Sequence, residues 1–138
     1  MQHHYIDWKP AYDLGIEDID YQHHFFLNLI NRLSEEVVKS ARTEYRTALI
    51  AELNAYAHFH FISEENLMMR SGYPKLEQHR QHHADLLDQL SLKENNLAMN
   101  SSEQDVRDII DFLTNWFLKH TTHEDRLFAD FLHQQEKS

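Results

Sequence analysis

The sequence contains no cysteine and very few residues that break helices. Its 138 residues include only two glycines and two prolines. Without cysteine the chain cannot form disulfides, thiolate zinc sites or iron–sulfur clusters. The absence of cysteine fits a reducing compartment, and we expect the cytoplasm. An all-β fold needs many turns, so the scarcity of glycine and proline favours a few long helices instead.

Positive charge and long apolar runs are also scarce. The chain has 13 Lys and Arg against 23 Asp and Glu, a formal net charge of −10. Nucleic-acid binding favours the opposite sign. No run of about 18 apolar residues is present to span a membrane, and residues 1–10 lack the apolar run of a secretory signal. The length suits one domain over residues 1–138.

Apolar residues recur at helical spacing through most of the chain. Phe26, Ile30, Leu33 and Val37, for example, follow one another at steps of three or four, which is typical of one buried helix face. We expect an irregular arm over about 1–17 and helices over about 18–39, 44–71, 74–94 and 102–132, with a polar loop over 95–102. Four such helices with short connections predict an all-α, antiparallel up-down four-helix bundle.

Several helix ends carry residues that commonly cap helices. Asp18 or Asp20 is expected to cap the start of the first helix, and Ser101 or Ser102 the start of the fourth. Gly72 lies where the second helix should end.

Histidine is the residue present in excess, with 12 copies. Every predicted helix places at least one histidine on its apolar stripe, and the set is His23, His60, His79, His83 and His120. Glu64 follows His60 by one turn and shares its face. One buried histidine is ordinarily a hydrogen-bonded core residue. A cluster is different, because unpartnered buried polar groups cost about 1–3 kcal/mol each. The pattern therefore predicts a metal site.

The residues alone limit the choice of metal but do not identify one metal. Imidazole and carboxylate ligands suit iron, zinc, copper or nickel, but more than four inward ligands argue against one tetrahedral zinc. Di-iron bundles rich in glutamate use a repeated Glu-x-x-His motif, which this histidine-rich set lacks. In the last helix, spacing alone favours Glu124, four residues after His120. The other histidines lie in the arm or off the stripes, where we expect exposure: His3, His4, His24, His58, His82, His123 and His133.

Three segments together resemble the bacterial hemerythrins over nearly the whole chain. They are DWKPAYDLGIEDIDYQHH, HFHFISEENLMMRSGYPKLEQHRQHH and WFLKHTTHED, in that order. They match the family's Asp-x-Gln-His opening, its His-Phe-x-x-Glu-Glu, Gly-Tyr-Pro and His-x-x-x-His run, and its Trp-x-x-x-His-x-x-x-x-Asp ending.

The resemblance implies a non-heme di-iron centre with a bridging oxide or hydroxide. By position, one iron would be bound by His79, His83 and His120 and the other by His23 and His60, with Glu64 and Asp125 bridging the two. This choice of Asp125 runs against simple helical spacing, which favours Glu124. Asp125 can lie on the same face as His120 only if the last helix bulges, bends or ends near residues 120–125.

The same resemblance implies that dioxygen binds reversibly at the iron held by His23 and His60, where one coordination position would stay open. Phe61 and Trp116 match the family's aromatic pocket wall. Phe26 and Thr121 also belong to the expected pocket, but stand where Leu and Ile are common. Because Thr121 carries a hydroxyl group, we expect the iron of this chain to autoxidise faster than it would with an apolar side chain at this position.

We therefore expect an oxygen carrier, store or delivery protein rather than an enzyme. The main alternative is an oxygen- or redox-sensing regulatory domain of a signalling protein. A di-iron oxidase or peroxide-consuming enzyme is less favoured, because the ligand set leaves few open positions. The expected partners are dioxygen and an oxygen-consuming or signalling protein, with neither nucleic acid nor membrane.

Overall fold

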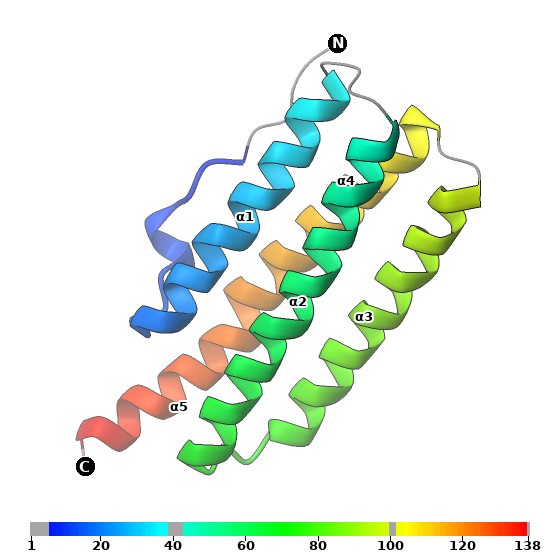
Figure 1. Ribbon diagram of the computed structural model, residues 1–138. Coiled ribbons are helices and arrows are strands. Elements are labelled where there is room, and N and C mark those ends of the chain that lie inside the picture. The colour runs from blue at the N-terminus through cyan, green and yellow to red at the C-terminus, as the bar shows by residue number, and fades with distance from the viewer. Residues whose placement is uncertain (1–5, 39–42, 100–101, 138) are drawn as a thin grey trace.

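The computed structural model describes residues 6–38, 43–99 and 102–137. Four long helices lie side by side in an antiparallel bundle, and a fifth continues the line of the fourth (Figure 1). The elements are a 3-10 turn at Pro10–Tyr12, α1 at Glu17–Val38, α2 at Thr43–Ser71, α3 at Leu76–Met99, α4 at Glu103–Lys119, a π-helical turn at His120–Glu124, and α5 at Asp125–Lys137. Helices α1 and α3 each pack against α2 and α4. The predicted all-α four-helix bundle is confirmed.

The ends of the helices follow local chemistry. The Ser102 hydroxyl accepts from the amide of Asp105 at 3.0 Å, and the Asp105 carboxylate accepts from the amide of Ser102, which forms a capping box at α4. Gly72 ends α2 at a φ of +69°, as predicted. The prediction for α1 is wrong, because the helix already starts at Glu17. Asp20 instead accepts from the amides of Leu14 and Gly15 in the arm. Ser101 lies outside the described residues.

Helix α3 is longer than predicted. The polar stretch from Asn95 was expected to be a loop, but the helix continues to Met99. Leu97 is 2% exposed and packs in the main core. Burying a leucine stabilises the fold by about 1.5–3 kcal/mol. Placing Asn95 and Asn96 in a helix costs less than about 1 kcal/mol each, so the burial of Leu97 outweighs this cost. Tertiary packing therefore extends the helix.

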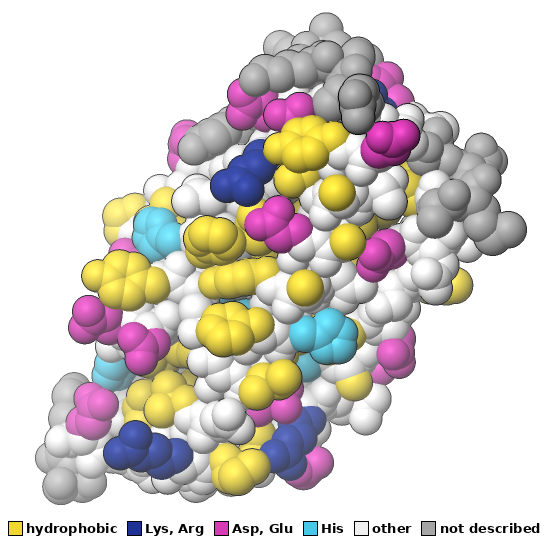
Figure 2. All heavy atoms as spheres, in the orientation of Figure 1, with side chains coloured by type: hydrophobic (Ala, Val, Ile, Leu, Met, Phe, Trp, Pro, Cys, Tyr) yellow, Lys and Arg dark blue, Asp and Glu magenta, His cyan; other side chains and the backbone are white. Residues whose placement is uncertain are grey.

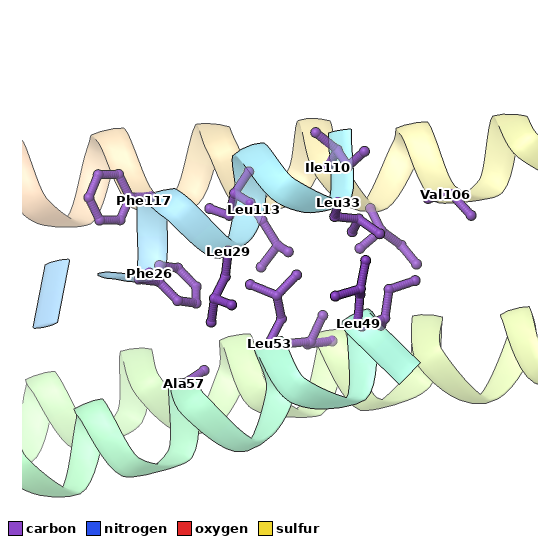
Figure 3. Packing of buried hydrophobic residues seen from close by; sticks show 14 of the residues in the cluster. Phe26, Leu29, Leu33, Leu49, Leu53, Ala57, Val106, Ile110, Leu113 and Phe117 are labelled. Atoms are coloured by element: carbon purple, nitrogen blue, oxygen red, sulfur yellow. The ribbon is translucent and has the colours of Figure 1, made fainter. Parts of the chain in front are cut away.

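Two hydrophobic clusters fill the bundle, one on each side of a polar layer. The larger cluster packs α1, α2 and α4 together, with their apolar side chains pointing toward one another (Figure 3), and adds residues of α3. The smaller cluster joins the arm to the end of α2 and to α5, through Leu14, Ile16, Ile19, Met68, Tyr73, Phe128 and Ala129. Along α1, His23 falls between Ile19 of the smaller cluster and Phe26 of the larger one. His120 and Asp125 likewise fall between Phe117 and Phe128 in the chain. Packing therefore defines a buried polar layer.

Contacts to α5 hold the arm against the bundle. The Arg126 guanidinium donates to the carbonyl oxygens of Ala11 and Asp13 at 2.9 and 2.7 Å. His133 Nε2 donates to the carbonyl of Leu14 at 2.7 Å. These bonds join the arm before α1 to α5, which lies at the other end of the described chain.

The viewed surface carries hydrophobic side chains over α1 and α2 (Figure 2). Exposed members on these helices are Tyr21, Phe25, Tyr45, Phe59, Ile62 and Met69. In the described part of the chain, no helix combines the length and apolar character needed to cross a membrane.

Candidate metal centre

Seven buried side chains from α1, α2, α3, the π-helical turn and α5 converge in the polar layer. Each is at most 4% exposed, and they are His23, His60, Glu64, His79, His83, His120 and Asp125. Their ligand atoms form two groups, each contained within 4.8 Å. One group holds three histidines, His79, His83 and His120, and the other holds His23 and His60. Glu64 and Asp125 belong to both groups.

Each carboxylate turns one oxygen toward each histidine group. Asp125 Oδ1 lies 2.8 Å from His120 Nε2 and 3.1 Å from His79 Nε2, while Oδ2 lies 3.2 Å from His23 Nε2. Glu64 Oε1 lies 3.3 Å from His83 Nε2, and its Oε2 lies 3.5 Å from His60 Nε2. The two acids thus stand between the groups, with one oxygen available to each side.

The spacing of the imidazole nitrogens suits metal coordination. His23 and His60 bring their Nε2 atoms within 3.1 Å of each other, and His83 and His120 do the same. Two nitrogens bound at right angles to an ion, with bonds of about 2.1 Å, are about 3 Å apart. Each pair can therefore bind one ion with little movement.

Unpartnered polar atoms in the layer also point to a cation. Both carboxylate oxygens of Glu64 and Oδ2 of Asp125 are buried without a hydrogen bond to any described residue. Leaving such atoms unpaired costs about 1–3 kcal/mol each, and more for charged groups. Cations bound between the two acids would use these lone pairs. The donor set, imidazole with carboxylate, suits a divalent transition metal.

The electrostatics of the metal-free layer are uneven. Burial, helped by the charge of His23, lowers the pKa of His60 to about 3, so its imidazole is neutral. Burial opposes the protonation of His120, but the charge of Asp125 and its hydrogen bond raise that pKa to about 10. Although burial and their mutual repulsion oppose ionisation, the neighbouring histidines, His120 foremost, lower the pKa values of Glu64 and Asp125. A proton on His120 thus balances the acids, and metal binding must displace it.

A π-helical turn places Asp125 in the layer. The amide of Asp125 donates to the carbonyl of His120, five residues earlier instead of four. The extra residue brings Asp125 onto the face of His120 and leaves Glu124 outside, with 31% of its side chain exposed. The bulge predicted near residues 120–125 is confirmed.

The family model of the hemerythrin HHE cation-binding domain matches residues 14–132, which include all seven converging side chains. This chain belongs to the hemerythrin family. Among its relatives is the bacteriohemerythrin of Clostridium acetobutylicum, 29% identical over 89% of this chain and 98% of the relative. Another, from Stenotrophomonas maltophilia, is 27% identical over 89% and 78%. A hemerythrin point-mutant crystal structure, 22% identical, shares the fold at a TM-score of 0.83 over 92% of this chain and 96% of that one.

The aromatic residues around the polar layer of this hemerythrin lie next to different histidine groups. Phe61 stacks on His83, with ring centroids 3.9 Å apart, and lies 5.6 Å from His60. Trp116 stacks on His120 at 4.2 Å, so it lies against the three-histidine group rather than beside His23.

The aromatic neighbour of His23 is Phe117, at 5.6 Å. Phe26 lies 5.9 Å from Phe117 and is 3% exposed. Sequence reasoning missed Phe117, although Leu113, Phe117 and His120 share one helical stripe. The side chain of Thr121 lies outside the described residues.

Two residues that sequence reasoning left without a role contact the outer nitrogens of histidines that are predicted to be ligands. Gln22 Oε1 lies 2.7 Å from His60 Nδ1, and Glu65 Oε2 lies 2.7 Å from His83 Nδ1. Both directly neighbour a predicted ligand in the chain, but no periodicity marks them out.

The histidines that were expected to be exposed are more varied. His58, His82 and His123 are exposed. His24 stacks on Trp8 with ring centroids 3.6 Å apart, and His133 bonds to the arm. His3 and His4 lie outside the described residues.

Proposed function

We propose that this chain holds two iron ions and binds dioxygen reversibly, as an oxygen carrier, store or delivery protein. The observation that carries the proposal is the pair of shared carboxylates, each turning one oxygen toward a three-histidine group and one toward a two-histidine group. Such an arrangement suits two ions that differ by one ligand.

In this proposal Glu64 and Asp125 would hold both ions, together with a bridging oxide or hydroxide. His79, His83 and His120 would hold one iron, while His23 and His60 would hold the other, which would keep one position open; these are the two groups whose ligand atoms lie together. When bound, two ferrous ions supply the two electrons that reversible dioxygen binding requires.

The chain's own packing would protect such a centre. The polar layer lies between two apolar clusters, so bulk water reaches it poorly. Phe117 and Phe26 cover the side of His23, and Phe61 lies near His60. An apolar wall would slow the entry of water and protons that promote oxidation of the iron. We propose a binding role rather than an enzymatic one, because the ligand set leaves little room for a second substrate at the metals.

The test is an iron analysis combined with optical spectra. We expect two irons per chain, a spectrum that changes when the anaerobically reduced protein meets dioxygen, and its return when argon removes the gas. Glu64→Ala should lose iron, whereas Glu124→Gln, which alters an outward carboxylate, should behave as wild type. One zinc per chain, or oxidation that argon cannot reverse, would contradict the proposal.

A further inference from the structure

The two halves of the centre differ in the groups that contact the outer nitrogens of their histidines. On the three-histidine side, His83 Nδ1 faces a carboxylate oxygen of Glu65 at 2.7 Å. On the two-histidine side, His60 Nδ1 faces the amide oxygen of Gln22, also at 2.7 Å. Both oxygens are acceptors, so each Nδ1 donates its proton and each Nε2 keeps its lone pair for a metal.

Glu65 brings a full negative charge to its half. Its other oxygen lies 3.7 Å from Arg80 Nε, and Arg80 is held in turn by Glu77. The Glu65 side chain is only 21% exposed, which limits screening by water. The arginine holds the carboxylate in place against His83.

Gln22 is held as firmly but carries no charge. Its amide nitrogen donates to the Ser63 hydroxyl at 3.0 Å, which keeps its oxygen toward His60. Its backbone carbonyl accepts from the Tyr56 hydroxyl at 3.0 Å. The amide therefore orients His60 without adding charge to that half.

We propose that Glu65 and Gln22 act as positioning residues that increase the difference between the two metal sites, so that the site of His79, His83 and His120, which already has one more histidine, fills first. A carboxylate draws the Nδ1 proton more strongly than an amide does, and this makes the imidazole a stronger donor to its metal. The inference rests on the proposed two-metal centre, but it does not depend on dioxygen.

Anaerobic titration of the metal-free protein with Co²⁺ tests the order of filling. We expect two resolved binding steps in the wild type. Glu65→Gln keeps the shape and removes the charge, so it should weaken the first step by about 10–100-fold. Gln22→Glu should strengthen the second step, and the double exchange should bring the two steps closer together. Glu65→Asp should restore part of the first step.

Proton NMR of the cobalt forms adds a readout that a merely structural role would not move. The paramagnetic ion shifts the exchangeable imidazole N–H signals, and Glu65→Gln should move the signal that appears in the first step. Glu52→Gln is the matched control, because Glu52 lies on α2 like Glu65 and also contacts an arginine, Arg32, but 48% of its side chain is exposed. It should leave the isotherm and the signal as in wild type. Circular dichroism checks that each metal-free variant is folded.

Two equal steps in the wild type, or an unchanged first step and signal in folded Glu65→Gln, would overturn the inference while leaving the two-metal centre intact. Uptake of a single cobalt by the wild type would instead overturn the proposed function together with it.

Discussion

Replacing Asp125 by asparagine should destabilise the metal-free protein far more than replacing Glu124 by glutamine. The two acids are neighbours, yet Asp125 is fully buried against three histidines, while 31% of the Glu124 side chain is exposed. Removing one partner of a buried charge pair costs about 3–5 kcal/mol. We expect the lower end, because His120 can release its proton once the acid is gone.

A loss of about 3 kcal/mol lowers the melting temperature of a domain of this size by about 12 °C, at about 4 °C per kcal/mol. Glu124→Gln should change the free energy of unfolding by no more than about 0.5 kcal/mol. Urea and thermal unfolding of both metal-free variants, followed by circular dichroism, give the comparison. Equal losses of stability in the two variants would refute the reasoning that assigns Asp125 to the buried layer.

Three further predictions follow from burial, backbone conformation and charge. Leu53 is only 1% exposed, so Leu53→Ala should lower the free energy of unfolding by about 2–5 kcal/mol. Leu92 is 62% exposed, so Leu92→Ala should lower it by no more than about 0.5 kcal/mol. Similar losses for the two variants in urea unfolding would contradict the described core. Gly72→Ala should cost about 1–2 kcal/mol because the φ of +69° strains an alanine, although no atom lies close enough to clash; no loss in the same assay would show that the turn does not need this conformation. The stability of the metal-free protein should be greatest near pH 6.5. The lowered pKa of His60 gives stability above pH 6.5 that is lost as the pH falls toward about 3, and the raised pKa of His120 gives stability below pH 6.5 that is lost as the pH rises toward about 10. A flat profile of urea midpoints from pH 4 to 9 would count against the charge pattern.

Helical periodicity alone predicts most of the layer. His23, His60 and His120 share stripes with apolar residues, and an α-helix must turn such a stripe inward when it packs. The fold follows from the same pattern, because few breakers and four apolar stripes leave little alternative to a bundle.

Helical periodicity does not predict that Asp125 belongs to the layer. Its position depends on the π-helical turn, in which one extra residue changes the face of everything that follows. Helix propensity does not predict such a turn, because the turn depends on tertiary structure, in which the Asp125 carboxylate is buried. Only the resemblance to a family motif indicated Asp125 in place of Glu124.

Other features depend on contacts between helices. Gln22 and Ser63 meet across α1 and α2, and Glu65 meets His83 across α2 and α3. The extra turns of α3 exist because Leu97 finds a place in the core. Such pairings become visible only once the packing of the bundle is known.

The most direct test of the two-metal centre is a crystal structure of the iron-loaded protein, with anomalous scattering measured at the iron edge. We predict two peaks about 3.5–4 Å apart, one surrounded by His79, His83 and His120 and the other by His23 and His60, with Glu64 and Asp125 between them. A single peak, or iron bound away from this buried layer, would contradict it.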